Sequence, residues 1–403
     1  MTTTSSVLIV GASTAGWRTA TALRAAGYDG SIVVVGDEPH LPYDRPCLSK
    51  QLLLGTWPVE RAYLTTATEV RDLAVDLRLG VAVRAVGAGH AELTDGSTVS
   101  FEHLVVATGV RPRLPPGWAA GRAMHVLRRI GDSVTLRRSL AGASNVLVVG
   151  GGFIGTEVAA AARRLGLETT ILLQEDVLLE LALGPAAGGA VTESHRANGV
   201  KVLPGAMIGT ILTASDDEVV VELADGARLE SDCAVFGLGS LPNVEWLAGC
   251  LPGDLSGGLP CDGSGRVIGS PFPMHAVGDV ASWPDEHFGG HVRHEHWTSA
   301  GEQARVVAAT LTGATRPPRS LPYFWSDQFN KIQLVGRPDL ATSVVRIDTA
   351  GGGRPGAIFA YYRGTTLVAA AAIDAPRALA AVRRVVSHDT GDRDLARLVG
   401  SVG

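Results

Sequence analysis

Two glycine-rich stretches are the residues of this chain whose types and spacing point most directly to chemistry. VLIVGASTAG spans 7–16 and VLVVGGGFIG spans 146–155, and each follows a β-branched run and precedes an alanine-rich segment. In such a strand–turn–helix unit, glycines allow a tight bend and a close approach to a pyrophosphate, and the helix N-terminus offers N–H groups to the phosphates. The sequence therefore predicts two dinucleotide sites, one on Gly11, Ser13, Ala15 and Gly16 and one on Gly150, Gly152 and Gly155.

The first turn is supported by residues farther along the chain. Asp37 follows Gly16 by about 20 residues, which is where an acidic residue reads a ribose hydroxyl. A solvated turn aspartate is the alternative. Two further strand-like runs end in Ala107-Thr108-Gly109 and in Gly278-Asp279. Because parallel strands end at one edge of a sheet, we expect these segments to meet in one crevice.

The elements that must position these residues follow a repeated order of strands and helices. We predict an α/β fold with two Rossmann-like, three-layer nucleotide-binding domains and a C-terminal α+β domain. The expected boundaries are 1–111 with 243–320 for a discontinuous first nucleotide domain, 112–242 for the second, and 321–403 for the last. A single alanine- and arginine-rich helix is expected to end the chain.

Composition and charge restrict the function classes. The 403 residues carry a net charge of -5 with both signs mixed, which argues against a nucleic-acid partner. The chain begins with a short uncharged stretch, and Gly11 interrupts the apolar run that follows. We therefore expect no signal peptide, no membrane span and a cytoplasmic location. Cys47, Cys233, Cys250 and Cys261 form no C-x-x-C pair, so a redox dithiol is not expected. The cluster of His291, His294 and His296 is expected in a surface or site-lining loop, without a metal.

A longer match comes from the loop at 36–50, GDEPHLPYDRPCLSK. It resembles the G-(D/E)-E-x-x-x-P-Y-(D/E)-R-P-P-L-S-K loop of FAD-dependent, NADH-using ferredoxin reductases of the putidaredoxin reductase type. The resemblance extends to Ala107-Thr108-Gly109, Gly278-Asp279, EHW at 295–297 and YFWSDQ at 323–328. It implies an oxidoreductase that passes electrons from NADH through FAD to an iron–sulfur protein, docked near Trp325, Lys331 and Arg305.

The same resemblance implies roles for individual residues. Asp37 would hold the FAD ribose, Lys50 would reach the flavin N5 edge, and Val83 would contact the adenine side. Arg45, Arg128, Asp279 and Trp297 would complete the FAD pocket, while Glu157 would lie near the nicotinamide. The catalytic residues are then Lys50, Glu157 and Trp297. The alternatives are ordinary core packing for Trp297 and Trp325, and an exposed helix glutamate for Glu157.

The second nucleotide site departs from the family pattern. The glutamate expected after its second strand is Leu173, and the basic positions beyond it are Val177 and Leu181. Glu175 or Asp176, about 20 residues after Gly155, could replace the ribose contact. We expect NADH to bind more weakly than in the family. We expect NADPH to be disfavoured further, because no arginine is available to bind its 2′-phosphate. Cys47 replaces a proline of the 36–50 loop. We expect it to be a small buried residue that fills the proline site, and the alternative is a catalytic thiol.

These departures motivate two other functions. One is a flavoenzyme of the same fold that acts directly on a small organic substrate with a degenerate NADH site. The other is a flavin-bearing interaction protein, for which the sequence contains no added docking segment.

Overall fold

The computed structural model describes residues 5–115, 118, 123–215, 217–349, 355–388 and 392–400. The chain divides into two compact units. The first comprises Met1–Asp44, Glu60–Arg111 and Leu241–Pro322, and the second comprises Arg45–Val59, Pro112–Ser240 and Tyr323–Gly403. Among the described residues, no helix is both long and apolar enough to cross a membrane.

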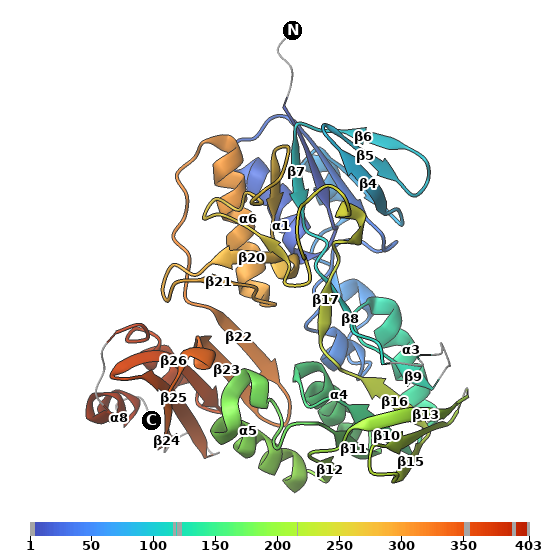
Figure 1. Cartoon of the computed structure of the whole chain (residues 1–403), viewed down its shortest axis with the longest axis vertical. Coiled ribbons are helices and arrows are strands. Elements are labelled where there is room, and N and C mark those ends of the chain that lie inside the picture. Colours follow the sequence, from blue (N-terminus) through green and yellow to red (C-terminus); the bar gives the residue numbers. More distant parts are fainter. Residues whose placement is uncertain are drawn as a thin grey trace. The chain divides into compact units, whose positions relative to one another are not determined.

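The first unit is built on a five-stranded parallel sheet (Figure 1). Its three central strands read as nearly continuous valine, isoleucine and leucine runs because both faces are covered. In spatial order they are β19 (Met274–Ala276), β7 (His103–Val106), β1 (Ser6–Val10), β2 (Ser31–Gly36) and β3 (Val75–Leu79).

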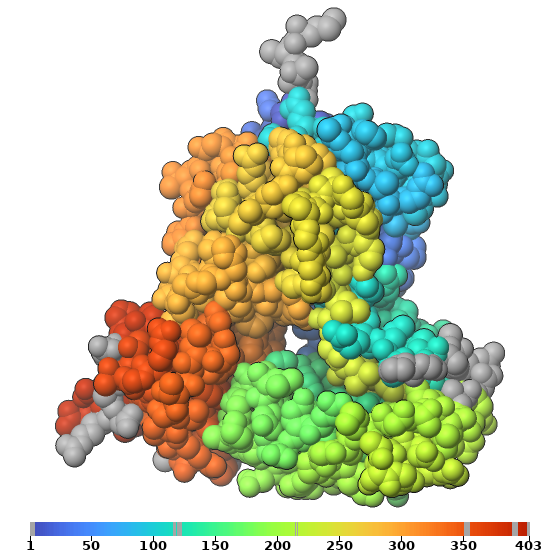
Figure 2. Space-filling model, in the orientation of Figure 1, coloured from blue at the N-terminus to red at the C-terminus, as the bar shows by residue number. Residues whose placement is uncertain are grey.

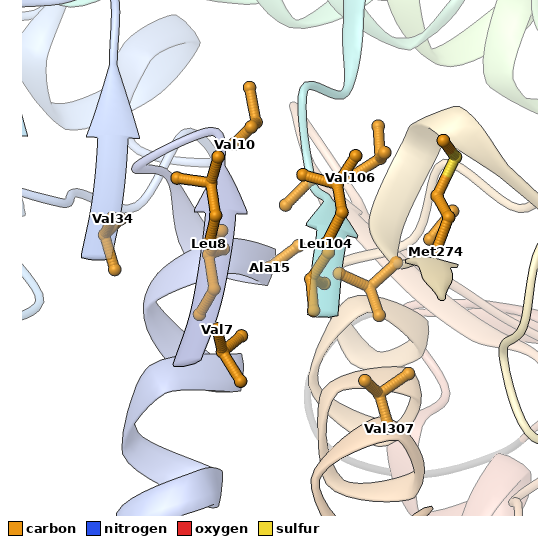
Figure 3. Packing of buried hydrophobic residues seen from close by; sticks show 14 of the residues in the cluster. Val7, Leu8, Val10, Ala15, Val34, Leu104, Val106, Met274 and Val307 are labelled. Carbon is orange, nitrogen blue, oxygen red and sulfur yellow. The ribbon is translucent and has the colours of Figure 1, made fainter. Parts of the chain in front are cut away.

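The core of this unit joins strands that are distant in sequence. Helix α1 (Thr14–Ala25) packs against α6 (Trp297–Thr312). Figure 3 shows Leu8, Leu104 and Met274 on neighbouring strands, with Val307 of α6 below them. Ala15, in the first turn of α1, belongs to the same cluster. The start of α1 is therefore placed against the ends of β1 and β7.

Smaller elements complete the first unit. The remaining elements are α2 (Ala67–Asp72), the 3-10 turns η2 (Val59–Ala62), η3 (Glu245–Leu247) and η4 (Gly278–Val280), and the strands β4 (Val83–Gly87), β5 (His90–Leu93), β6 (Thr98–Ser100), β8 (Val110–Pro112), β17 (Ser240–Pro242), β18 (Leu259–Pro260), β20 (Ala281–Pro284) and β21 (His291–Val292).

The second unit contains a second five-stranded parallel sheet. Its order is β12 (Val200–Leu203), β11 (Glu168–Leu172), β10 (Asn145–Val149), β16 (Cys233–Phe236) and β9 (Met124–His125). Around it lie α3 (Ile130–Gly142), α4 (Phe153–Arg164), α5 (Glu180–Ala197), the π-helical turn η1 (Leu48–Leu52) and the antiparallel strands β13 (Ile208–Ala214), β14 (Val219–Leu223) and β15 (Arg228–Ser231).

An antiparallel sheet from the C-terminal part belongs to this same unit. Its order is β22 (Tyr323–Asp327), β23 (Lys331–Gly336), β26 (Thr366–Ile373), β25 (Gly356–Arg363) and β24 (Ser343–Thr349), with η5 (Pro338–Leu340). The helix expected at the end of the chain is divided in two, α7 (Pro376–Val382) and α8 (Asp392–Gly400). Residues 383–387, which follow α7, form turns.

The predicted α/β fold with two parallel nucleotide-type sheets and a C-terminal α+β part is confirmed. The division into three domains stays a prediction. Contact density groups the second parallel sheet with the C-terminal sheet.

Candidate functional site

The first glycine turn can exist only with glycine at two of its positions. Gly11 has a φ of 115°, and a Cβ there would lie 2.2 Å from the carbonyl oxygen of Ala107. A Cβ on Gly16 would lie 1.8 Å from the carbonyl oxygen of Gly11. Both approaches are far closer than van der Waals contact, so the turn between β1 and α1 depends on the absence of these side chains.

The structure brings the other predicted strand ends to this turn. Gly278 has a φ of 76°, and a Cβ on it would lie 2.8 Å from Cβ of Ala15. Its N–H donates to Oε1 of Gln303 at 2.7 Å. Gly109 also has a positive φ, of 64°. The hydroxyl of Thr108 donates to the carbonyl of Asn243 at 2.7 Å, which ties the 107–109 segment down.

Four other residues predicted for this site, Ser13, Asp37, Val83 and Asp279, belong to the same unit. Ser13 precedes α1 but does not cap it through its side chain. Asp37 is exposed directly after β2, and Asp279 is half-buried in η4. Val83, the first residue of β4, is buried in the core cluster. The structure therefore leaves the roles of these residues as predictions.

Trp297 is not an ordinary core residue. It is half-buried, and its indole Nε1 donates to Oδ1 of Asp44 at 2.7 Å. The guanidinium carbon of Arg18 lies 3.7 Å from the ring centroid, a cation–π contact. Trp325 in the second unit is also half-buried and stacks on Tyr323, with centroids 6.3 Å apart. Core packing therefore describes neither tryptophan.

The second glycine turn repeats the first in detail. Gly150 has a φ of 111°, and a Cβ there would lie 2.3 Å from the carbonyl oxygen of Gly237. A Cβ on Gly155 would lie 2.1 Å from the carbonyl oxygen of Gly150. A Cβ on Gly152, just before α4, would meet open space. The backbone at the helix start is therefore open to a ligand.

This turn forms one wall of a cavity of about 560 Å³. Apolar side chains dominate the lining. They are Pro115, Val149, Phe153, Leu172, Leu173, Val177, Leu179, Leu181, Ala182, Ala206, Met207, Ile208 and Leu238. The size and character suit a ligand pocket.

Three charged side chains line the same cavity. They are Arg113, Glu175 and Glu180. Oε2 of Glu180 accepts from the N–H groups of Asp176 at 3.0 Å and Val177 at 3.2 Å. Of the two predicted ribose contacts, only Glu175 reaches the lining. Arg113 also lines the cavity, although it lies outside the βαβ unit. The expectation that no arginine is available for a ribose 2′-phosphate stays a prediction.

A buried ion pair lies elsewhere in the second unit. Nζ of Lys50 is 2.7 Å from Oε2 of Glu157, and the two side chains are 11% and 6% exposed. Ser49 donates to the same Oε2, and Ser326 donates to Oε1 at 2.5 Å. Lys50 also donates to the carbonyl of Pro46 at 3.1 Å. The alternative of an exposed helix glutamate at position 157 is therefore wrong.

The hydrogen-bond network continues from this pair to α5. Nε2 of Gln328 donates to the hydroxyls of Thr156 at 2.7 Å and Ser326 at 3.0 Å. His195 lies 3.3 Å from the Thr156 carbonyl, and burial lowers the pKa of its imidazole. Sequence reasoning missed the three polar residues Ser49, Ser326 and Gln328. Ser326 and Gln328 lie in the YFWSDQ motif, from which only the tryptophan was used, and Ser49 lies in the 36–50 loop beside Lys50.

The remaining predicted residues have structural contacts. Nη1 of Arg45 donates to the carbonyl of Arg128 at 2.5 Å. Cys47 is 6% exposed, which favours the small buried residue over the catalytic thiol. The rings of His294 and His296 stack, whereas His291 bonds to the carbonyl of Cys261. No group of three or more potential metal ligands occurs among the described residues.

Two family models match the chain. Pyridine nucleotide-disulphide oxidoreductase matches residues 5–304, and Reductase C-terminal matches residues 323–399. Relatives include the anthranilate 1,2-dioxygenase system ferredoxin–NAD(+) reductase component of Burkholderia cepacia, 38% identical over 94% of this chain and 93% of the relative. Rhodocoxin reductase of Rhodococcus erythropolis is 35% identical over 95% of this chain and 90% of the relative.

Solved structures agree with these matches. The reductase in a covalent putidaredoxin reductase–putidaredoxin complex superposes with a TM-score of 0.90 at 29% identity, over 99% of each chain. A ferredoxin reductase from Rhodopseudomonas palustris gives a TM-score of 0.87 at 30% identity, over 98% of this chain and all of the other.

Proposed function

This chain belongs to the pyridine nucleotide-disulphide oxidoreductase family, and on that premise we propose that it carries electrons from NADH through FAD to an iron–sulfur ferredoxin. The family and the oxidoreductase class predicted from the sequence are confirmed. The observation that carries the proposal is the presence of two well-formed dinucleotide turns together with a buried lysine–glutamate pair.

The first unit has the local geometry that a flavin dinucleotide requires. Its turn has no side chain at Gly11 and Gly16, and the segments at 107–109 and 278–279 lie beside it. These features let a pyrophosphate approach the start of α1. We propose that Asp37, Val83, Asp279 and Trp297 of this unit contribute to FAD binding. For Arg45 and Arg128, which belong to the second unit, the same role is proposed from the family resemblance alone.

Within the buried pair, the ammonium of Lys50 would supply an oriented positive group for this chemistry. When bound, a flavin accepts a hydride from a reduced nicotinamide and releases single electrons. Ser49 and Ser326 hold both oxygens of Glu157, and Glu157 in turn holds the ammonium of Lys50. A preoriented charge of this kind stabilises developing negative charge without reorganisation. We propose this electrostatic role for Lys50, with Glu157 near the nicotinamide.

NADH is the nucleotide that the second cavity fits best. The glycine turn offers the N-terminus of α4 to a pyrophosphate. Glu175 and Glu180 line the cavity, and their charge would repel a 2′-phosphate. Arg113 is the one basic side chain among the described lining residues.

The electron acceptor is proposed by analogy with the relatives. One relative is named as a ferredoxin–NAD(+) reductase component of a dioxygenase system, and another is named rhodocoxin reductase. One solved structure holds putidaredoxin reductase together with putidaredoxin. We also propose a cytoplasmic location, supported by the lack of any disulfide bond among the described residues.

Anaerobic stopped-flow mixing tests the proposal. The FAD-loaded protein is mixed with NADH, and we expect flavin bleaching within seconds at submillimolar NADH. A two-iron ferredoxin added afterwards should be reduced, as its visible spectrum reports. Absence of bleaching at millimolar NADH would contradict the proposal.

A second function is favoured by one observation, the apolar character of the cavity at Leu173, Val177 and Leu181. A flavoenzyme with a degenerate nucleotide site would oxidise or reduce a small organic substrate directly. In that case the flavin stays oxidised in NADH but changes spectrum with the organic substrate.

A further inference from the structure

The cavity beside the second glycine turn contains the elements for a pyrophosphate but not the usual ones for an adenosine ribose. We propose that it holds the adenosine half of the nucleotide by apolar contact with Leu181 and Met207, without selecting the ribose 2′-hydroxyl through a strand-end carboxylate. This inference rests on the proposed use of NADH and names how that site recognises its substrate.

The pyrophosphate end of the cavity is intact. Gly150, Gly151 and Gly152 all line it, and α4 begins directly after them. Because a Cβ at Gly152 would meet nothing within 4 Å, a phosphate can approach the backbone there. The nucleotide is therefore anchored by backbone N–H groups.

The ribose position is closed by a leucine. Leu173 directly follows β11, where an acidic side chain would normally accept the ribose hydroxyl. It is 2% exposed, and its Cδ1 lies 2.9 Å from where a Cβ of Gly151 would be. The side chain thus packs against the glycine turn. A carboxylate at this position would displace that packing, so the leucine is part of how this turn is built.

The two acidic residues on the lining differ in their availability. Glu180 accepts two backbone hydrogen bonds from the 176–177 loop, which fixes its carboxylate against the chain. Glu175 is half-buried, and its backbone carbonyl lies 3.4 Å from the N–H of Gly205. Of these two carboxylates, Glu175 is therefore the one that could still contact the ribose hydroxyl, and the experiment must test it separately.

Two exposed apolar side chains line the cavity. Leu181 is 88% exposed and Met207 is 52% exposed. Leu181 belongs to α5, and Met207 directly precedes β13. Figure 2 shows the green surface of α5 beside the yellow-green surface of the β13–β15 sheet. Large apolar side chains left in water at a cavity indicate a surface that a ligand covers.

Leu181 is placed by a special backbone feature. It lies in the first turn of α5, and Gly184, with a φ of 70°, and Pro185 separate this turn from the rest of the helix. Leu179 begins the turn with a φ of 57°, and its N–H donates to the carbonyl of Gly151 at 2.9 Å. The turn is therefore tied to the glycine loop, which presents Leu181 to the same ligand. The faces of an adenine ring suit a leucine and the adaptable thioether of methionine.

Isothermal titration calorimetry of the FAD-loaded protein with ADP-ribose tests the inference without any turnover. Leu181→Ala should weaken binding about three- to ten-fold, because apolar contact area is lost. Leu165→Ala is the matched control, since Leu165 is 44% exposed near the end of α4 and does not line the cavity. It should leave the dissociation constant unchanged. 2′-Deoxy-ADP-ribose should bind within about two-fold of ADP-ribose, whereas a charged ribose contact would make it about ten-fold weaker or more.

The outcomes separate this inference from the proposed function. It is overturned if Leu181→Ala binds like the wild type, or if the 2′-deoxy compound binds ten-fold more weakly in the wild type. If Glu175→Gln abolishes such a difference, Glu175 is the ribose contact. If ADP-ribose does not bind while NADH still bleaches the flavin, the inference fails and the reductase function stands. If ADP-ribose does not bind and NADH does not bleach the flavin, both the inference and the proposed reductase function fail.

Discussion

The buried pair of Lys50 and Glu157 should be strongly coupled, and a double-mutant cycle measures this coupling. The variants are Lys50→Met, Glu157→Gln and the two together. At 2.7 Å with an effective dielectric of about 20, the Coulomb attraction is about 6 kcal/mol. Desolvation of both groups offsets much of it, so breaking the pair by one substitution should cost about 3–5 kcal/mol.

The two single changes leave different groups behind. Lys50→Met leaves a buried carboxylate that has only the hydroxyls of Ser49 and Ser326. Glu157→Gln leaves a buried ammonium that has the carbonyl of Pro46. The double variant buries neither charge. Its cost should therefore fall below the sum of the single costs by about 2–4 kcal/mol.

Urea unfolding at saturating FAD gives the free energy of unfolding of each variant. Circular dichroism and tryptophan fluorescence follow the unfolding, and the values are used where the transitions seen by the two probes coincide. The exposed pair Arg228–Glu222 of the same unit, 65% and 34% exposed at 3.1 Å, is the control. Its coupling should stay below about 1 kcal/mol. A coupling for Lys50 and Glu157 no larger than the control, or a stabilising Lys50→Met, would refute the reasoning.

Three further predictions concern other parts of the chain. Gly155→Ala should weaken NADH binding about ten- to a hundred-fold, because its Cβ would lie 2.1 Å from the carbonyl oxygen of Gly150. The control Gly189→Ala should leave NADH binding unchanged, because the space around Gly189 is open. Equal dissociation constants for the two variants would contradict this prediction. Burial lowers the pKa of His275 to about 4, so the unfolded chain binds a proton that the folded chain does not between pH 6.5 and 4. Stability should therefore fall by up to about 3 kcal/mol as the pH drops through this range, and His275→Leu should flatten that part of the profile in urea titrations. Cys47→Ser should leave steady-state turnover unchanged, since the thiol is buried; a large loss would restore the catalytic-thiol alternative.

The glycine turns could be predicted because their requirements are local. A Cβ at Gly11 or Gly150 would meet a carbonyl oxygen of a neighbouring strand end, and the strand–turn–helix pattern already implies that neighbour. The parallel sheets follow from valine-rich runs of strand length alternating with helical segments. The charged pair was predicted only as two separate residues, assigned through a family resemblance.

What the sequence by itself determined is the pair of βαβ turns, the fold class and the loss of the acidic residue at Leu173. Each depends on residues within one strand–turn–helix unit. Only the tertiary structure decided that Glu157 is buried between Ser49 and Ser326, which lie 108 and 169 residues away in the chain. It also decided that Glu175 lines the cavity while Asp176 does not, and that Arg113 joins it. The physical reason is that burial and side-chain partners depend on how distant segments pack, and spacing along one segment carries no information about that packing.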